Sequence, residues 1–502
     1  TMSPIKALVL DFAGVLCSWT PPAQSPFSPA QLKQIMSSEI WFDYERGRYS
    51  EEECYAKLVE RFSISAADMA STMIQARQSL EINHTVLELL SKTRKRNPGL
   101  KVYGMTNTPR AEQECISRIV DSYPVFDHVY LSGVVGMRKP DLGFYWVVLA
   151  ETGLKPDEVV FVDDKAENVL VAQSVGMHGV VFKNVADFNQ RIRNLLEDPV
   201  SRGLRYLRSN AKSLLTVTSD NSVIHENFAQ LLILELTGDR DLIELEPWDR
   251  TWNYFIGIPQ SPTSTFPNDL DTTSIALSVL PIHKDVVSGV MDEILLLLDN
   301  DEIVPTYFDP TRPRVDPVVC VNVLSLFAQN GRECELLATF NWILDVLRHR
   351  AYLQGTRYYI SPDAFLYFLA RLSTFLRMSP LRARLVPLLG ERLHERIGAT
   401  GDAISLAMRV YACKLLGMSN LLDESTLRDM QCEDGGFPTC WVYRFGSTGV
   451  KIGNRGLTTA LAIKAIEMPL TPRDVGIDTE QRSQWWFWGG VELLNPYRFW
   501  KS

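Results

Sequence analysis

Short runs of β-forming residues alternate with helical stretches through roughly the first 195 residues. The runs IKALVLDF, KVYGMTN, FDHVYLSG, EVVFVDD and HGVVFKN are each bounded by turn-forming or polar residues. Strands that alternate with helices typically form a parallel sheet with helices on both faces. The alternation therefore predicts a doubly wound α/β domain over residues 1–197. A long insertion with helical periodicity, about residues 17–88, predicts a helical cap over the carboxyl edge of the sheet.

The pattern changes after Leu195, where long segments of apolar periodicity replace the strands. NFAQLLILEL, TTSIALSVL, CVNVLSLFAQN and DAFLYFLARL are typical of buried helices. The breakers in EDPVSRG place the domain boundary near residues 197–205. Residues 198–502 are therefore expected to form a nearly all-α domain, with helical hairpins stacked around a ring or solenoid.

Composition limits the classes of partner and the compartment. The chain of 502 residues has 51 Lys and Arg against 60 Asp and Glu, a net charge of -9, so no basic field exists to bind nucleic acid. The longest apolar runs are far shorter than the ~20 residues that a transmembrane helix needs, and the first residues lack a signal-peptide pattern. Eight scattered cysteines form no CxxC pair. These features predict a cytoplasmic protein with reduced thiols and no transmembrane segment.

Polar residues follow the predicted strands of the α/β domain at their carboxyl ends, the edge where open sheets bind ligands. The candidates, in chain order, are Asp11, Thr106, Asn107, Lys139, Asp163 and Asp164. The carboxylates can hold Mg²⁺, while Lys139 and the Thr106 hydroxyl neutralise a phosphoryl group that Asp11 attacks. A lone aspartate at a strand end is often a cap, so it is the combination in this order that indicates a phosphate site.

This part of the chain resembles the haloacid dehalogenase-like (HAD) superfamily, in the subgroup with a helical cap. The resemblance implies that Asp11 is the nucleophile and that Mg²⁺ is the cofactor. It implies that the phosphate is bound by Thr106, Asn107 and Lys139, and the metal by Asp11, Asp163, Asp164 and the backbone carbonyl of Ala13.

The chain departs from the HAD pattern at Ala13. Family phosphatases have a second aspartate at that position, which protonates the leaving group, whereas Ala13 offers no proton. An alkoxide leaving a phosphate monoester needs that proton, but phosphate leaving a diphosphate needs much less help. The substitution is therefore expected to impair monoester hydrolysis most.

The helical half has a second candidate site in PNDLDTTSIAL. Asp269 and Asp271 stand two residues apart just before an apolar helical run, so one reading is a helix cap at Asp271 or Thr272. The functional reading is a carboxylic acid that burial and a neighbouring carboxylate keep protonated. Such an acid can protonate an alkene, provided that aromatic faces stabilise the resulting carbocation.

Aromatic residues are plentiful in this half, although ordinary core packing is the default reading for each. They include Trp248, Trp252, Tyr254, Phe255, Trp342, Tyr358, Tyr359, Phe365, Tyr367, Phe368, Trp441, Tyr443, Trp485, Trp486, Phe487 and Trp488.

The acidic motif resembles that of class II terpene cyclases, in which DxDD or DxDTT protonates a polyprenyl chain inside an α/α barrel. The stretch from Gln431 to Phe437 is similar to the QxxDGxW-type repeat of that family, with Phe for Trp. The resemblance implies that Asp271 is the proton donor and Asp269 its hydrogen-bonding partner. Thr272 and Thr273 occupy the last two positions of the motif. It also implies that residues 198–502 form one such barrel.

The fusion of both halves resembles the drimane-type sesquiterpene synthases, whose HAD-like half carries a DDxxE pattern, here from Asp163 to Glu167. The resemblance implies cyclisation of farnesyl diphosphate, a small-molecule prenyl diphosphate, to drimenyl or albicanyl diphosphate. Members differ in whether the diphosphate is then removed, and Ala13 bears on that step. A separate phosphatase acting on the product is then a further partner.

An anionic diphosphate also needs a cationic anchor. Basic residues in loop-like settings of the helical half are Arg348, Arg350, Arg357, Arg444, Lys451 and Arg455. Lys451 and Arg455, which follow an aromatic stretch, are the predicted anchors. Two alternatives stay open beside a bifunctional cyclase and phosphatase that releases the free alcohol: a HAD-type phosphatase with a helical interaction domain, and a non-catalytic scaffold.

Overall fold

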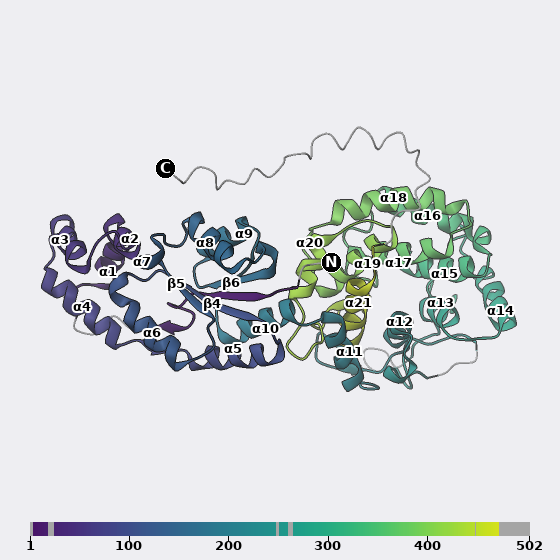
Figure 1. Cartoon of the computed structure of the whole chain (residues 1–502). Coiled ribbons are helices and arrows are strands. Elements are labelled where there is room, and N and C mark those ends of the chain that lie inside the picture. Colours follow the sequence, from purple (N-terminus) through teal and green to yellow (C-terminus); the bar gives the residue numbers. More distant parts are fainter. Residues whose placement is uncertain (1–3, 19–24, 247–249, 260–264, 447, 471–502) are drawn as a thin grey trace. The chain divides into compact units, whose positions relative to one another are not determined.

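The computed structural model describes residues 4–18, 25–246, 250–259, 265–446 and 448–470. The chain folds into two compact units (Figure 1). Of the described residues, the first unit contains those up to 209 and 428–438, and the second contains those of 210–427 and from 439 onwards. The segment 428–438 therefore leaves the second unit along the chain and packs as part of the first.

The first unit is built on a five-stranded parallel sheet in the order β5-β4-β1-β6-β7. Its strands are β1 (Ala7–Leu10), β4 (Lys101–Thr106), β5 (His128–Leu131), β6 (Val159–Asp163) and β7 (His178–Val181). This order confirms the predicted doubly wound α/β domain. Because β1 lies between β4 and β6, the residues that follow these three strands meet at one edge of the sheet.

Alternate residues of β1 contact helices on opposite faces of the sheet, as the two-residue period of a strand requires. Leu8 and Leu10 pack in one cluster with residues of α5 (His84–Arg96), α6 (Gln113–Ser122) and α10 (Val185–Leu196). Ala7 and Val9 pack in the other with α8 (Leu142–Thr152) and α9 (Ala166–Ser174). In Figure 1 these two groups of helices lie on opposite sides of the strands.

The predicted cap is a group of four helices inserted after β1. These are α1 (Pro29–Met36), α2 (Glu39–Glu45), α3 (Glu51–Phe62) and α4 (Ala66–Gln78). Each begins after a serine whose side chain accepts a hydrogen bond from the first turn, and these serines are Ser28, Ser38, Ser50 and Ser65. The insertion is closed by pairing of β2 (Cys17–Ser18) with β3 (Glu81–Ile82). Cap residues such as Trp41, Leu58 and Met69 form a core of their own.

Six helices of the second unit close into a ring. They are α12 (Asn227–Thr237), α13 (Leu270–Val279), α15 (Pro317–Gln329), α17 (Pro362–Phe375), α19 (Ala403–Leu415) and α21 (Arg455–Glu467). Each packs against the next, and α21 packs against α12. Their side chains are almost wholly buried, since α15 is buried from Val318 to Ala328. The predicted α/α barrel is confirmed by this ring.

Further helices pack around the ring. α16 (Leu337–Arg348) and α18 (Leu381–Arg396) pack outside α15, α17 and α19. Figure 1 shows α14 (Lys284–Leu295) at the periphery, and α20 (Leu421–Asp429) follows α19. In the first unit, α7 (Ser132–Val135) follows β5 and α11 (Pro199–Ser209) follows α10.

The second unit also has a small antiparallel sheet, which the nearly all-α prediction missed. Its order is β10-β11-β8-β9, with β8 (Thr216–Thr218), β9 (Val223–Ile224), β10 (Trp441–Arg444) and β11 (Lys451–Asn454). Strands of two to four residues are too short to show an alternation of apolar and polar positions. β8 and β9 precede α12, and β11 leads directly into α21.

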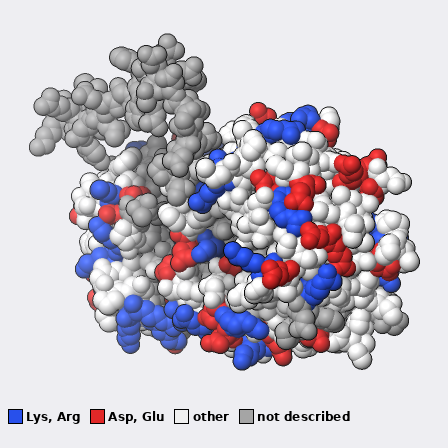
Figure 2. All heavy atoms as spheres, turned by 90° about the vertical axis from the view of Figure 1, so that its right-hand side faces the viewer, with Lys and Arg blue, Asp and Glu red and all other residues white. Residues whose placement is uncertain are grey.

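Three further observations concern the charged surface, the helices and the cysteines. Acidic and basic side chains are interspersed over the face drawn in Figure 2. Within the described ranges, the helices are all too short or too polar to cross a bilayer. Each of the eight cysteines is a free thiol.

Candidate functional site

A buried lysine ties together two carboxylates at the carboxyl edge of the first unit's sheet. Lys139 Nζ lies 2.8 Å from Asp11 Oδ1 and 2.7 Å from Asp163 Oδ2. Lys139 and Asp163 side chains are 1% and 0% exposed, so these charges are shielded from solvent. Burial raises the pKa of Asp11 to about 6, while the Lys139 ammonium acts in the opposite direction.

Neighbouring amides hold these charged groups in place. Asn107 accepts a hydrogen bond from Lys139 N at 2.7 Å and donates one to Lys139 O at 2.9 Å. Asn168 Nδ2 donates to both oxygens of Asp163 at 3.0 Å. The Thr106 hydroxyl lies 2.9 Å from that of Thr108. Asn107 thus positions the lysine through its backbone, and Thr106 stands at the end of β4 as the sequence predicts.

The carboxylates of Asp11, Asp163 and Asp164 can each bring one oxygen within 4.8 Å of the others. Oxygen donors of this kind suit Mg²⁺. Gly14, with φ of +86°, gives Asp164 room, because a Cβ there would lie 2.6 Å from its Oδ2. Ala13 is exposed and carries no proton donor. Glu167, the last residue of the DDxxE pattern, is exposed in the first turn of α9.

In the second unit, Asp269 caps α13. Its Oδ1 accepts a hydrogen bond from Thr272 N at 2.6 Å, so the capping residue is Asp269 rather than Asp271 or Thr272. Its other oxygen, Oδ2, is buried and has no hydrogen-bond partner among the described residues. Thr273 Oγ1 accepts from Trp252 N at 2.8 Å and so fixes the preceding loop.

Asp271 lies in the first turn of α13 and is held by two side chains from other helices and loops. Asn322 Nδ2 donates to its Oδ1 at 2.7 Å, and the Tyr359 hydroxyl donates to its Oδ2 at 2.6 Å. The family resemblance predicts that Asp269 is the hydrogen-bonding partner of Asp271. Instead, Asp269 Oδ1 accepts the capping hydrogen bond from Thr272 N. Tyr359 was one of many aromatic candidates, and Asn322, inside the apolar run of α15, gave no sequence signal.

Burial shifts both carboxyl groups towards their protonated form. Burial raises the pKa of Asp269 to about 8 and that of Asp271 to about 7. The hydrogen bonds from Tyr359 and Asn322 act in the opposite direction on Asp271, because they stabilise its carboxylate. When Asp271 is protonated, the same two donors can stabilise the anion that is left after it gives up its proton.

These carboxyls line a cavity of about 330 Å³ in the second unit. Its size is that of a small-molecule site. Four of the predicted aromatics line it, namely Tyr254, Tyr358, Tyr359 and Tyr443, together with four that the sequence did not single out, Phe228, Phe266, Tyr307 and Phe445. Their rings form a connected shell, with centroids 5.7 Å apart for Tyr359 and Tyr443 and 5.6 Å for Phe266 and Tyr307.

The other aromatic candidates do not line the cavity or cannot be placed. Trp252, Phe255, Trp342, Phe365, Tyr367, Phe368 and Trp441 are not part of its wall. Trp248 and the cluster Trp485 to Trp488 lie outside the described residues.

The cavity wall contains four arginines, Arg312, Arg314, Arg357 and Arg444. Arg357 and Arg444 were among six basic candidates. The two that the sequence favoured do not line the cavity: Lys451 is exposed on β11, and Arg455 begins α21. Arg312 and Arg314, in a loop before α15, gave no distinguishing signal.

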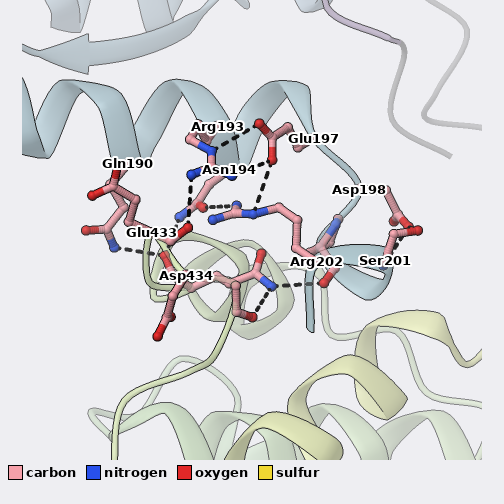
Figure 3. A network of polar contacts seen from close by, with 12 residues as sticks. Gln190, Arg193, Asn194, Glu197, Asp198, Ser201, Arg202, Glu433 and Asp434 are labelled. Carbon is pink, nitrogen blue, oxygen red and sulfur yellow. Dashed lines mark hydrogen bonds and ion pairs between the residues drawn. The ribbon is translucent and has the colours of Figure 1, made fainter. Parts of the chain in front are cut away.

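The segment similar to a QxxDGxW repeat packs in the first unit and supplies no residue to the cavity wall. Gln431 Nε2 donates to Pro199 O at 2.9 Å and to Gly435 O at 2.8 Å. The buried Arg202 of α11 donates to Cys432 O at 2.7 Å and to Asn194 Oδ1 at 2.6 Å. Figure 3 shows this network between α10, α11 and the loop that carries Glu433 and Asp434. These contacts make the segment a structural part of the first unit.

Fold and sites together define an enzyme that joins a HAD-like domain to a helical terpene cyclase domain. Family comparison agrees: residues 5–176 match the haloacid dehalogenase-like hydrolases, and residues 200–330 match the sesquiterpene cyclase astC-like C-terminal domain.

The chain belongs to the drimane-type family of HAD and terpene cyclase fusions. It is 48% identical over 464 residues to drimenol cyclase drtB of Aspergillus calidoustus, covering 92% of this chain and 88% of the relative. Its first part is 35% identical over 175 residues to sesquiterpene phosphatase astK of Aspergillus oryzae, covering 35% of this chain and 88% of that protein. A predicted HAD-like hydrolase of Porphyromonas gingivalis is 22% identical, with a TM-score of 0.32, and covers 39% of this chain and 100% of that chain.

Proposed function

We propose that the chain cyclises farnesyl diphosphate to a drimane-type diphosphate, drimenyl or albicanyl diphosphate, by protonation from Asp271. The observation that carries the proposal is the setting of Asp271. It is a buried carboxyl held by Asn322 and Tyr359 in the wall of an aromatic cavity, and burial raises its pKa to about 7. The drimenol cyclase relative, alike over most of its length, supports the same reaction class.

The reaction follows from the placement of the proton. Asn322 donates to Asp271 Oδ1 and the Tyr359 hydroxyl donates to Oδ2. A protonated carboxyl oxygen keeps lone pairs that accept such a bond, so Oδ2 can carry the acidic proton beside Tyr359. That proton adds to the distal double bond of the prenyl chain, whose π electrons form the new C–H bond. The remaining double bonds then attack the cation in turn and close two rings, while the C–O bond to the diphosphate stays intact. The faces of Tyr359 and Tyr443 stabilise the moving cation, and loss of a proton ends the sequence.

For the first unit we infer Mg²⁺ binding by Asp11, Asp163 and Asp164, and slow removal of the terminal phosphate. When bound, the metal would neutralise charge on the phosphoryl group. Lys139 holds Asp11 in position, and Asp11 can attack the terminal phosphorus. Ala13 supplies no proton to the leaving group, so the phosphoanhydride bond is the easier one to break. The phosphatase astK, similar to this part of the chain, supports a sesquiterpene phosphate as its substrate.

Product analysis tests both halves. Purified protein is incubated with farnesyl diphosphate and Mg²⁺, one half of the sample is extracted directly and the other after added phosphatase, and products are identified by mass spectrometry. A bicyclic alcohol that is found in the second half alone is expected. The same alcohol at equal yield in the first half would show that the first unit cleaves the ester despite Ala13. A farnesol skeleton in both halves would overturn the cyclase proposal.

The variant Asp271→Asn tests the acid. It replaces a neutral carboxyl by a neutral amide of the same shape, so the melting temperature is expected to stay unchanged while cyclisation is lost. Asp345→Asn is the matched control, because Asp345 is an exposed aspartate of the second unit paired with Arg348. Cyclisation that survives in Asp271→Asn would remove this residue from the mechanism.

A further inference from the structure

The cavity is lined by residues from the N-terminal ends of several ring helices. Its wall includes Phe228 at the start of α12, Asp269 and Asp271 at the start of α13, Val319 at the start of α15 and Ile452 just before α21. The N-terminus of a helix carries a partial positive charge and favours anions. Several such ends directed at one cavity therefore favour an anionic group there.

The arginines of the cavity wall add full positive charges. Arg314 and Arg357 are exposed, and Arg312 and Arg444 are half-buried, whereas Asp269 is buried. The guanidiniums thus lie at the accessible part of the wall and the acid at its buried part. We call Arg312, Arg314, Arg357 and Arg444 the arginine rim.

Three members of the rim are free to bind an anion. Arg314, Arg357 and Arg444 form no ion pair with a carboxylate of the described residues, while Arg312 has Asp309 at 3.5 Å. Arg444 is held by donating to Thr356 O at 2.7 Å and Arg357 O at 3.2 Å, which leaves its other N–H groups available.

Contacts also fix the position of Arg357. Its guanidinium lies 5.7 Å from the ring centroid of Tyr358. It packs against Gly446, where a Cβ would lie 3.0 Å from Arg357 Nε. Guanidiniums placed in advance in this way bind phosphate oxygens through paired hydrogen bonds with little loss of entropy.

The carboxyls of the same cavity are poor ligands for a metal ion. Asp269 and Asp271 are the acidic residues that line it. Thr272 N, Asn322 and Tyr359 already donate to three of their four carboxyl oxygens, which leaves Asp269 Oδ2 alone without a partner among the described residues. Mg²⁺ takes six ligands, so this wall offers it little. Within the described ranges, the one group of three potential metal ligands is that of Asp11, Asp163 and Asp164 in the first unit.

We propose that the arginine rim binds the diphosphate of the prenyl substrate directly, so that cyclisation needs no divalent metal and the metal requirement is confined to phosphate removal by the first unit. The inference rests on the proposed cyclisation and adds to it the means by which the headgroup is held. Guanidinium charge takes the place that Mg²⁺ has in many diphosphate sites.

The first test separates the two reactions by metal removal. The full chain is incubated with farnesyl diphosphate in two samples, one with excess EDTA and one with Mg²⁺. Both samples are then inactivated by heat, and phosphatase with excess Mg²⁺ is added to release the alcohols. Equal yields of bicyclic alcohol are expected, with inorganic phosphate released before inactivation in the Mg²⁺ sample alone. Cyclisation that disappears in EDTA and returns with Mg²⁺ would overturn the inference while leaving the cyclase proposal intact. Absence of bicyclic product in both samples would instead overturn the cyclase proposal.

The second test measures binding without turnover. In the Asp271→Asn background and in EDTA, the dissociation constant of farnesyl diphosphate is measured by calorimetry for chains with Arg314→Gln or Arg357→Gln. Each substitution removes a charge-assisted contact and is expected to weaken binding roughly 10- to 100-fold. Arg348→Gln is the control, since Arg348 is an exposed arginine of the same unit outside the cavity wall. Equal affinity in the rim variants and the control would refute the rim as the headgroup site.

The loss should depend on headgroup charge. Farnesyl monophosphate carries fewer negative charges than the diphosphate, so the rim variants are expected to lose less affinity for it. A loss of the same size for both ligands would point to a general change of the cavity and would contradict direct binding of the diphosphate. Melting temperatures of the variants, measured in parallel, are expected to match that of the parent.

Discussion

Replacing Tyr359 by Phe removes one hydroxyl from Asp271 and leaves the aromatic shell in place. The Tyr359 hydroxyl donates to Asp271 Oδ2 at 2.6 Å, and the ring lies among Phe228, Phe368 and Tyr443, with centroids 5.7 to 6.5 Å away. Phenylalanine keeps these ring contacts. The variant therefore changes the strength of the acid without changing the surface that stabilises the cation.

The size of the effect follows from the hydrogen bond. A hydrogen bond to a charged group contributes about 1.5 to 3 kcal/mol, and 1.36 kcal/mol corresponds to about one pH unit. The hydroxyl stabilises the carboxylate, so its loss is expected to raise the pKa of Asp271 from about 7 by roughly one to two units. A weaker acid transfers its proton more slowly, and if about half of the change is expressed in the rate, kcat falls roughly three- to tenfold.

The pH profile of cyclisation measures both changes. The proposed reaction requires protonated Asp271, so in the parent chain kcat is expected to be constant at low pH and to fall as pH rises through about 7. In Tyr359→Phe the plateau is lower and the fall begins at higher pH. Tyr352→Phe is the control, because that hydroxyl is buried, lacks a partner among the described residues and lies outside the cavity wall. If kcat falls at the same pH in the parent chain and in Tyr359→Phe, the group that titrates in this pH range is not Asp271.

Three further predictions concern the other parts of the molecule. Ala13→Asp restores a general acid and is expected to raise hydrolysis of farnesyl monophosphate by roughly 10²- to 10⁴-fold, measured as released phosphate; no gain would mean that the missing acid does not limit the ester step. Asp11→Asn in that background is expected to abolish the gain. Gly14→Ala places a Cβ against Asp164 and is expected to lower phosphate release while cyclisation in EDTA is unchanged, and loss of both activities would contradict separate sites. Arg202→Ala removes the buried contacts that Arg202 makes with the loop in Figure 3. It is expected to lower the free energy of unfolding by about 3 to 5 kcal/mol, measured in denaturant. An unchanged unfolding midpoint would contradict a structural role for these contacts.

The sequence predicted the fold where its patterns were long and regular. The parallel sheet and the helical cap were predicted from runs of strand alternation and helix periodicity. Periodicity also predicted the helices of the second unit, but it left a ring or a solenoid open, and the barrel was predicted from the family resemblance. The sheet of β8 to β11 was missed because its strands have two to four residues. Such strands form through pairing between Thr216–Thr218 and Lys451–Asn454, which are more than 200 residues apart in the chain, and this pairing leaves no local pattern.

Candidate site residues could be predicted where they belong to a sequence motif, and could not be predicted where only tertiary packing brings them to the site. Asp271, Lys139 and Asp11 lie in short motifs with fixed order along the chain. Asn322 is a polar residue within an apolar helix, and only the ring closure of α13 against α15 brings it to Asp271. The rim residue Arg314 is one arginine among many until the cavity shows which guanidiniums share a wall.

The separation of the arginine rim from the acid answers opposing electrostatic demands. A guanidinium beside Asp271 would stabilise its carboxylate and remove the proton before substrate arrives. The one cation among the main influences on the pKa of Asp271 is Arg371, whose charge is offset by an ion pair with Glu235 at 2.7 Å. The proposed substrate has its diphosphate at one end and its reactive double bond at the other. It can contact the arginine rim and Asp271 at the same time only while the diphosphate is attached. Removal of the diphosphate before cyclisation would therefore release the chain from its anchor, and farnesol is expected to be neither bound nor cyclised. If the rim binds the diphosphate as proposed, cyclisation is expected to precede phosphate removal.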